Sequence, residues 1–305
     1  MIKSLAILSL TALAIGLPGP RHPIAGNAIQ AGLSDEQPAS PAPAAVSCTD
    51  VTFARSIKYG TDNLNVLDVA TAQTTPGAKR PVVVFVAGDS FEGSGDMAAV
   101  NPLVEQAMCF AANNGLVGIH VSYRVAPAAT WPAGAKDVAA AISWVYENAD
   151  LFGGNRQEII PIGYGTGAFH VASFLAHKEF QEKDDFIAGA VLVSGIYHPT
   201  TDAGEGVRAY FGTDISTYDS RSAINGLTKI EEPILLAWSQ ADAPNFIAQG
   251  EKLKDVLCSA GHCPRISVLS KPSSPASVFD LDGASADLHE RLRQLIGQID
   301  ARGLP

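Results

Sequence analysis

The feature that most constrains the fold of this 305-residue chain is a series of continuous apolar runs separated by segments with helical periodicity. Such runs are typical of parallel strands covered by helices on both faces, because neither face of the strand meets water. Between and after the runs, apolar residues recur with a period near 3.6 and fall on one face of each helix. These residues are Val138, Ala141, Ile142 and Val145 in one helix, and Leu288, Leu292, Leu295 and Ile299 in the last. The pattern predicts an α/β domain with a mostly parallel central sheet, whose strands are residues 81–88, 115–123, 158–165, 187–195, 233–240 and 264–270.

Some segments depart from this alternation. Residues 51–59 and 64–71 alternate apolar and polar side chains, which predicts an antiparallel edge to the sheet. Residues 197–232 separate two strands without the expected single helix, and predict a small cap over the carboxyl edge of the sheet. Pro161 lies inside a predicted central strand, where it removes a ladder hydrogen bond, so we expect a bulge before the turn that follows.

The strand at 158–165 leads into a glycine-rich turn and then a helix, EIIPIGYGTGAFHVASFLAH. This is the layout of a nucleophile elbow, whose usual pattern is G-x-S-x-G. Here a glycine occupies the position of the serine, and it has no side chain that could attack a carbonyl. Glycine adopts positive φ freely, so the turn is expected to keep its shape. The five residues of the pattern are Gly163, Tyr164, Gly165, Thr166 and Gly167.

The start of the chain has the composition of an export signal. Lys3 provides a basic start, and the apolar run at 4–17 is too short to remain in a bilayer as a spanning helix. We interpret residues 1–31 as a cleaved signal peptide, 32–49 as an Ala/Pro/Ser-rich linker and 50–305 as the folded domain. A retained membrane anchor is the alternative. The expected location is the periplasm or the extracellular medium, with no stable membrane span after cleavage.

Charge and composition exclude some classes of partner. Lys and Arg number 21 against 31 Asp and Glu, for a net charge of −10, and no basic stripe stands out. Nucleic acid is therefore not an expected partner. No cofactor motif is present, and we expect neither a cofactor nor a metal ion.

The chain has four cysteines, an even number that suggests disulfides in an exported protein. Cys258 and Cys263 flank only SAGH, which predicts a small closed loop. A metal site that uses His262 is the alternative, although its spacing fits no standard zinc pattern. Elimination pairs Cys48 with Cys109.

The stretch VSYRVAPAATWPAGAKDVAAAISWVYENADLFGG, at 121–154, runs into the glycine-rich turn. With the order of strands and helices, it resembles the α/β-hydrolase superfamily and its carboxylesterase branch, which includes the hormone-sensitive-lipase-like and kynurenine-formamidase-like hydrolases. The resemblance covers nearly the whole chain after residue 50. It implies the α/β-hydrolase fold and hydrolysis of carboxylic esters or amides by a Ser, an Asp and a His.

Carried onto this chain, the resemblance places the family's acid on Asp242, its nucleophile on Gly165 and its base on Ser274. The serine and the histidine are both absent from these positions. The family's oxyanion loop corresponds to Ala87, Gly88, Asp89 and Ser90, with the amide of Thr166 as the second donor. The carboxylate of Asp89 would oppose an oxyanion there, unless it caps a nearby turn.

We therefore expect a non-hydrolytic relative that binds a small molecule or an extracytoplasmic protein partner, including a role as a scaffold in an envelope assembly. Aromatic residues near the strand ends are expected to line its pocket: Phe91, Tyr164, Tyr197 and Phe246. The alternative is an active hydrolase with non-standard residues. In that hypothesis Asp89 or Asp242 activates a water, His198 moves in from the cap, or the nucleophile is Ser90, Ser194 or Ser239.

Overall fold

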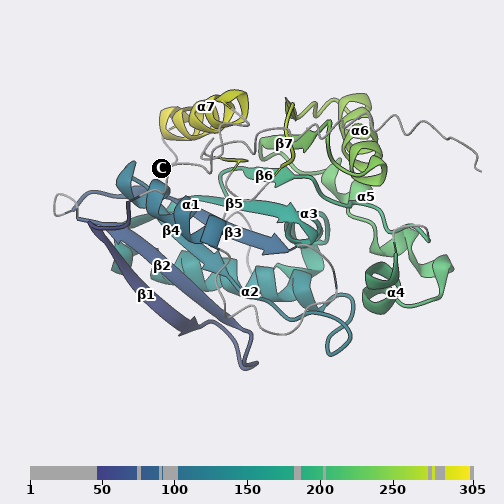
Figure 1. The fold of residues 1–305 in the computed structure, drawn as a ribbon, viewed down its shortest axis with the longest axis horizontal. Coiled ribbons are helices and arrows are strands. Elements are labelled where there is room, and N and C mark those ends of the chain that lie inside the picture. The colour runs from purple at the N-terminus through teal and green to yellow at the C-terminus, as the bar shows by residue number, and fades with distance from the viewer. Residues whose placement is uncertain are drawn as a thin grey trace, which may run out of the picture. The chain divides into compact units, whose positions relative to one another are not determined.

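The computed structural model describes residues 47–73, 77–88, 91, 102–181, 187–201, 204–273, 277–278 and 286–302 (Figure 1). The predicted signal peptide and nearly all of the predicted linker lie outside these residues. So do Asp89, Ser90 and Ser274. None of the described helices is both long enough and apolar enough to cross a bilayer.

The centre of the fold is one eight-stranded sheet in the order β1-β2-β4-β3-β5-β6-β7-β8. β1 pairs with β2 and β2 pairs with β4 in antiparallel fashion, and the other neighbours are parallel. This confirms the predicted mostly parallel sheet with an antiparallel edge. The strands are β1 (Val51–Lys58), β2 (Val66–Ala72), β3 (Arg80–Gly88), β4 (Val117–Val121), β5 (Gly154–Gly165), β6 (Ala190–Val193), β7 (Ile234–Ser239) and β8 (Arg265–Leu269).

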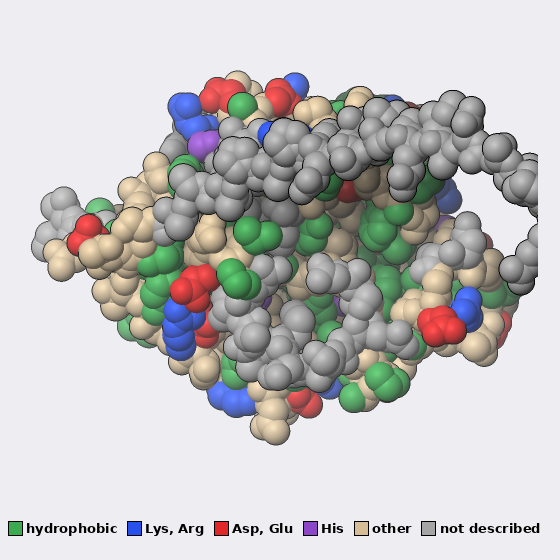
Figure 2. Space-filling model, in the orientation of Figure 1, with side chains coloured by type: hydrophobic (Ala, Val, Ile, Leu, Met, Phe, Trp, Pro, Cys, Tyr) green, Lys and Arg blue, Asp and Glu red, His purple; other side chains and the backbone are tan. Residues whose placement is uncertain are grey.

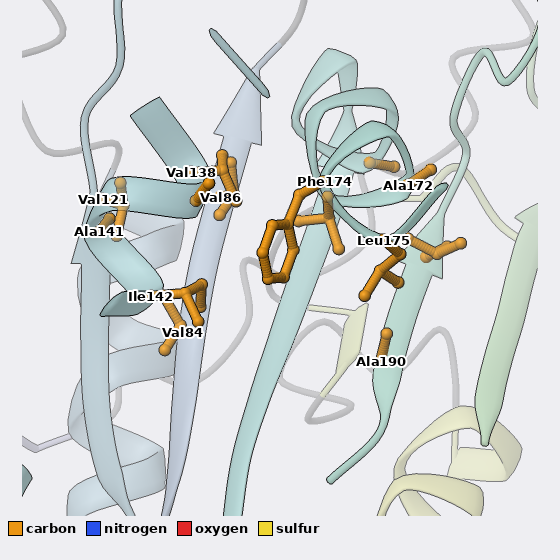
Figure 3. Packing of buried hydrophobic residues seen from close by; sticks show 14 of the residues in the cluster. Val84, Val86, Val121, Val138, Ala141, Ile142, Ala172, Phe174, Leu175 and Ala190 are labelled. Carbon is orange, nitrogen blue, oxygen red and sulfur yellow. The ribbon is translucent and has the colours of Figure 1, made fainter. Parts of the chain in front are cut away.

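Helices cover both faces of the sheet, because the strands are apolar on both sides. On one face α1 and α7 pack against it, and on the other α2, α3, α5 and α6 do so. Figure 3 shows the second face, where α2 and α3 place side chains such as Ile142 and Phe174 against β3 and its neighbours. The helices are α1 (Pro102–Asn113), α2 (Ala133–Asn148), α3 (Thr166–Ala176), α4 (Glu205–Phe211), α5 (Ile224–Leu227), α6 (Pro244–Ser259) and α7 (Ala286–Arg302).

The apolar faces predicted from the 3.6 period are the buried faces of their helices. In each helix the four predicted residues are at most 2% exposed, so the period alone identified the side that faces the sheet. They are Val138, Ala141, Ile142 and Val145 in α2, and Leu288, Leu292, Leu295 and Ile299 in α7.

The bulge expected at Pro161 is absent. Pairing between β3 and β5 is continuous from Ile159 to Gly165, and its register shift lies earlier, between Arg80 and Val82. The carbonyl of Ile159 accepts from the amide of Ala188, so the backbone N–H and C=O of Ile159 face the β6 side of the strand. The backbone groups of Pro161, two residues later, face the same side. On that side the ladder to β6 begins only at Ile162. The missing N–H of the proline thus falls in a gap of the ladder, where no bulge is needed.

The segment predicted as a cap, 197–232, contains helices and no strand among its described residues. It carries α4, α5 and two short 3-10 helices, η3 (Ile215–Thr217) and η4 (Asp219–Arg221). α4 places Tyr210 and Phe211 in a buried aromatic cluster with Phe91 and Phe169. Phe91 stacks on Tyr210, with ring centroids 5.1 Å apart, so burial of these rings holds the segment to the domain.

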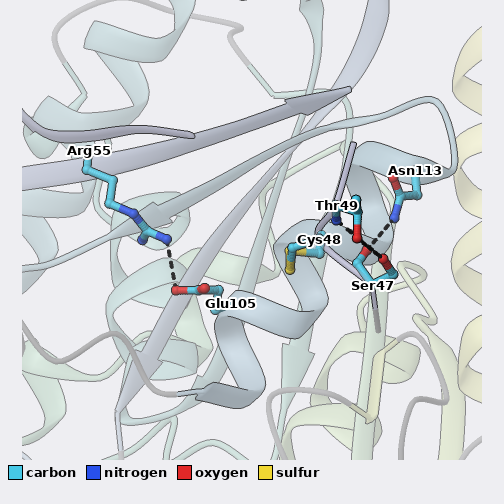
Figure 4. Close-up of a disulfide and its surroundings, with 7 residues drawn as sticks. Ser47, Cys48, Thr49, Arg55, Glu105 and Asn113 are labelled. Atoms are coloured by element: carbon cyan, nitrogen blue, oxygen red, sulfur yellow. Dashed lines mark hydrogen bonds and ion pairs between the residues drawn. A yellow bond between two sulfur atoms is a disulfide. The ribbon is translucent and has the colours of Figure 1, made fainter. Parts of the chain in front are cut away.

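Both predicted disulfides are present. Cys48–Cys109 joins the residues before β1 to α1, next to the hydrogen bond from Asn113 to the carbonyl of Ser47 (Figure 4). Cys258–Cys263 closes the loop after α6. The metal alternative at Cys263 is therefore wrong, because a sulfur in a disulfide is not available as a thiolate ligand.

Charged side chains on the face shown in Figure 2 form small groups in which blue Lys or Arg lie near red Asp or Glu. Ion pairs of this kind join Arg55 to Glu105 at 3.0 Å and Arg291 to Asp287 at 2.7 Å.

Candidate functional site

The glycine-rich turn has the geometry of a strand-to-helix elbow. β5 ends at Gly165 and α3 begins at Thr166, with Gly165 at φ 58° and ψ −123°. A Cβ on Gly167 would lie 2.0 Å from the carbonyl oxygen of Val86, and one on Gly163 would lie 2.4 Å from the Cα of Ala168. The outer glycines are therefore required by close packing, whereas the backbone conformation of the central one favours glycine.

The end of β3 is held against the start of α3. The Tyr123 hydroxyl donates to the carbonyl of Ala87 at 3.1 Å. The oxygen of this hydroxyl also lies 3.3 Å from Oγ1 of Thr166. Gly88 fits between them, since a Cβ there would lie 2.2 Å from the Tyr123 hydroxyl. Of the predicted oxyanion-loop residues, Ala87, Gly88 and Thr166 thus lie beside the elbow.

The carboxylate of Asp242 accepts three hydrogen bonds near the elbow. Its Oδ2 accepts from the Ser194 hydroxyl at 2.6 Å and from the Ser239 amide at 2.8 Å. Its Oδ1 accepts from the Ser273 hydroxyl at 3.0 Å. The hydroxyl oxygens of Ser194 and Ser273 lie 2.7 Å apart, and Tyr164 donates to the carbonyl of Ser273 at 3.0 Å. We call Ser194, Asp242 and Ser273 the serine–aspartate cluster.

Ser194 has an unusual backbone for a residue with a side chain. It directly follows β6 and has a φ of 49°, one of two positive values among the described non-glycine residues. A conformation of this kind costs on the order of 1–3 kcal/mol and persists where its surroundings require the side chain. Gly165 on the neighbouring strand has a similar φ without that cost.

The cluster forms one wall of a pocket with a volume of about 270 Å³. Tyr164 and Phe246 line it, as predicted from the sequence. Phe91 and Tyr197 do not, because both are buried, at 3% and 0% exposure, in the core beneath. The described lining residues are Gly88, Tyr164, Gly165, Ser194, Asp242, Ala243, Phe246 and Ser273.

No histidine is among the described residues that line this pocket. Of the seven in the chain, only His22 lies outside the described residues. His170 is buried among aromatic rings, which lowers its pKa to about 3, and burial of His120 on β4 lowers the pKa of that histidine to about 4. Burial also lowers the pKa of His198, whose Nε2 lies 3.7 Å from Oδ1 of Asp219. None of these imidazoles is placed to accept a proton from a pocket hydroxyl.

Of the serines considered as nucleophiles, Ser239 donates its hydroxyl to the carbonyl of Lys271 and does not line the pocket. Ser194 does line it. Sequence reasoning missed Ser273, because the family resemblance indicated the adjacent Ser274 as the base position. The one sequence signal for Ser273 is its place in the loop after β8. Its contact with Asp242 could not be read from the sequence, because the two residues are 31 apart.

Known proteins match both the sequence and the fold. Residues 67–258 match the family described as BD-FAE. The chain is 28% identical to the esterase LipQ of Mycobacterium tuberculosis over 200 residues, 62% of this chain and 46% of that protein. It is 35% identical to the esterase LipC of the same organism over 152 residues, 47% of this chain and 36% of that protein. The matched region spans less than half the length of either esterase.

Among solved structures, the chain superimposes on esterase B of Lactobacillus rhamnosis with a TM-score of 0.65, 17% identity and coverage of 83% of this chain and 86% of that one. A truncated carbohydrate esterase from gut microbiota gives a TM-score of 0.67 at 18% identity, over 85% and 99% of the two chains. At these identities the likeness shows the α/β-hydrolase fold alone.

Proposed function

The chain belongs to the BD-FAE family of α/β-hydrolase esterases, and within that family we propose that it is an exported, non-hydrolytic member that binds a ligand in the pocket above Gly165. The single observation that carries this proposal is the elbow. It has the backbone that presents a nucleophile, and its central residue is a glycine with no hydroxyl.

The contacts of Asp242 support the same conclusion. In a Ser-His-Asp triad the carboxylate orients an imidazole that takes the proton of the serine. Here the donors to Asp242 are two serine hydroxyls and one backbone amide. A serine hydroxyl is not basic near neutral pH, so these contacts hold the carboxylate in place without providing a general base.

An active hydrolase is the second candidate, because Ser194 approaches Asp242 at 2.6 Å in the same pocket. In this alternative the carboxylate would activate either the Ser194 hydroxyl or a water. In a Ser-His-Asp arrangement an imidazole takes the proton of the serine, and no histidine is among the described residues that line the pocket. We therefore rank this function second.

Export is supported by the apolar run at 4–17 and by two disulfides, which persist in oxidising compartments. A small molecule or an extracytoplasmic protein partner, including a partner in an envelope assembly, suits this location. Nucleic acid does not suit a chain with a net charge of −10.

The test combines a covalent probe with a substrate. The purified protein is incubated with a fluorophosphonate probe and, separately, with a short-chain aryl ester. We expect no labelling and no saturable turnover. Labelling or turnover that disappears in Ser194→Ala would replace the proposal with the second candidate.

A designed gain of function tests the assignment of the two missing groups. Gly165→Ser alone is expected to give no efficient turnover, since no base is in place. Gly165→Ser combined with Ser273→His should give more, because the Oγ of Ser273 already lies 3.0 Å from Asp242. A parallel pair uses Ser274→His at the position that the family resemblance indicates. Esterase-like rates from the single change would show that another group already acts as the base.

A further inference from the structure

The serine–aspartate cluster has more close oxygen contacts than protons to bridge them. Ser194 and Ser273 each donate their hydroxyl proton to Asp242, at 2.6 and 3.0 Å. Their two oxygens lie 2.7 Å apart and either can donate to the other, so two hydroxyl protons serve three contacts. The cluster therefore offers acceptor lone pairs to whatever enters the pocket, and a ligand that donates hydrogen bonds relieves the crowding of these oxygens.

The pocket is also negatively charged, which favours a ligand that donates hydrogen bonds and carries a positive charge. Among the described residues that line it, Asp242 is the only one with a charged side chain. Three donors hold it, from the residue after β6, the end of β7 and the loop after β8, so it does not turn away to solvent. A carboxylate in a partly enclosed pocket attracts a cation and repels an anion more strongly than it would in open water.

The remaining lining residues add an aromatic surface. Phe246, near the start of α6, and Tyr164 on β5 are half-buried and line the same pocket as Asp242. Tyr164 donates its hydroxyl to the carbonyl of Ser273, which helps to position that serine. Aromatic rings accommodate both an apolar body and a neighbouring positive charge.

The backbone of Ser194 is consistent with a binding role for its side chain. Glycine would occupy a φ of 49° without strain, as Gly165 does at 58°. The residue at 194 is a serine, and it lines the pocket. A residue that keeps a strained backbone and presents a polar atom to a cavity is a candidate for ligand contact.

From these observations we propose that the pocket binds a small primary ammonium compound with an apolar body. The proposal rests on the function proposed above, that the site holds a ligand without cleaving it. The ammonium donates to the oxygens of the serine–aspartate cluster, and the apolar body lies against Phe246. A hydrogen-bond acceptor at the other end of the ligand suits the elbow, where the positive end of the α3 dipole begins.

The experiment titrates three probes of the same skeleton into the purified protein by calorimetry: 2-phenylethylammonium, the neutral 2-phenylethanol and the anionic phenylacetate. We expect the ammonium to bind at least about tenfold more tightly than the alcohol, and phenylacetate to bind most weakly. Equal binding of the three, tighter binding of the anion or no binding of the ammonium would overturn the proposal.

Variants identify the atoms responsible. Asp242→Asn should weaken the ammonium about tenfold or more while leaving the alcohol nearly unchanged, and Phe246→Leu should weaken both. The matched control is Asp255→Asn, which removes one charge from an exposed carboxylate on α6 and should leave all affinities unchanged. Equal effects of Asp242→Asn and Asp255→Asn on ammonium affinity would contradict the assignment of Asp242 as the group that binds the ammonium. If Asp242→Asn does not fold, the order of the three probe affinities in the parent protein and the effect of Phe246→Leu still test the proposal.

Failure of this inference is distinguishable from failure of the proposed function. Ester turnover or fluorophosphonate labelling contradicts the non-hydrolytic role whatever the probes do. Silence in both assays, together with no preference for the ammonium, contradicts only the ligand class.

Discussion

At the scale of single residues, glycines decide the shape of the elbow by two different mechanisms. The backbone of Gly165, at φ 58°, favours glycine, whereas Gly167 is required by space, since a Cβ there would lie 2.0 Å from the carbonyl oxygen of Val86. The contact involves backbone on both sides, so no side-chain rotation relieves it. The glycine at 165 therefore leaves the turn unstrained, and the glycine at 167 allows α3 to pack against β3.

We expect Gly167→Ala to destabilise the domain by about 3 kcal/mol or more, because α3 would have to move away from β3. The matched control is Gly297→Ala in α7, where a Cβ meets nothing within 4 Å. That change should stabilise by about 0.5–1 kcal/mol through helix propensity. Urea unfolding of both variants measures the difference, and equal effects would contradict the packing argument.

A second residue-scale prediction concerns the cost of a serine at position 165. Gly165→Ser places a side chain at positive φ and should lower the free energy of unfolding by on the order of 1–3 kcal/mol. Thermal and urea unfolding of the variant beside the parent protein provide the measurement. A variant at least as stable as the parent would show that the elbow does not strain a serine.

At the scale of elements, disulfides tie segments that the sheet alone would leave free. Cys48–Cys109 links the residues before the edge strand β1 to α1 across 61 positions of sequence, whereas Cys258–Cys263 spans 5. In the chain-entropy account, the longer loop restricts the unfolded chain more strongly. The first bond is therefore expected to stabilise the folded domain more than the second.

Removal of Cys48–Cys109 by paired Cys→Ala changes should cost about 4 kcal/mol, and removal of Cys258–Cys263 about 2 kcal/mol. Denaturant unfolding of the two double variants tests the order. A greater loss from the shorter loop would contradict an entropic origin.

At the scale of the whole molecule, acid sensitivity is built into two buried histidines. Burial lowers the pKa of His120 to about 4 and that of His170 to about 3, from the ordinary value of 6.5 for a solvated imidazole. In the folded state both imidazoles stay neutral down to about pH 4 and 3, whereas in the unfolded chain the same two rings bind protons below about pH 6.5. Their contribution to stability is therefore complete above about pH 6.5 and is lost as the pH falls toward about 4 and 3.

We expect the free energy of unfolding to fall between about pH 6.5 and 5, a range above the ordinary pKa of carboxyl groups, with a slope of up to about 1.4 kcal/mol per pH unit for each histidine. His120→Leu and His170→Leu should each make the slope shallower, whatever they do to stability at neutral pH. Urea unfolding at several pH values measures it. An unchanged slope in both variants would contradict this origin.

Sequence alone determined the elements, the elbow, the buried helix faces and the pairing of the cysteines. These follow from local rules: a period of 2 or 3.6, the backbone freedom of glycine and the count of four cysteines. The position of Asp242 after its strand was likewise readable, because ligands in open α/β sheets lie beyond the carboxyl ends of the strands.

Only the tertiary structure decided which side chains meet there. Ser194 and Ser273 reach Asp242 across 48 and 31 residues of sequence, and no local period encodes such a contact. The gap that accommodates Pro161 depends on where β6 begins to pair, and the aromatic burial of Phe91 and Tyr197 depends on the segment above the sheet. The periodicity of a chain specifies which face of an element is buried, whereas the partner of a polar atom depends on how the elements close on one another.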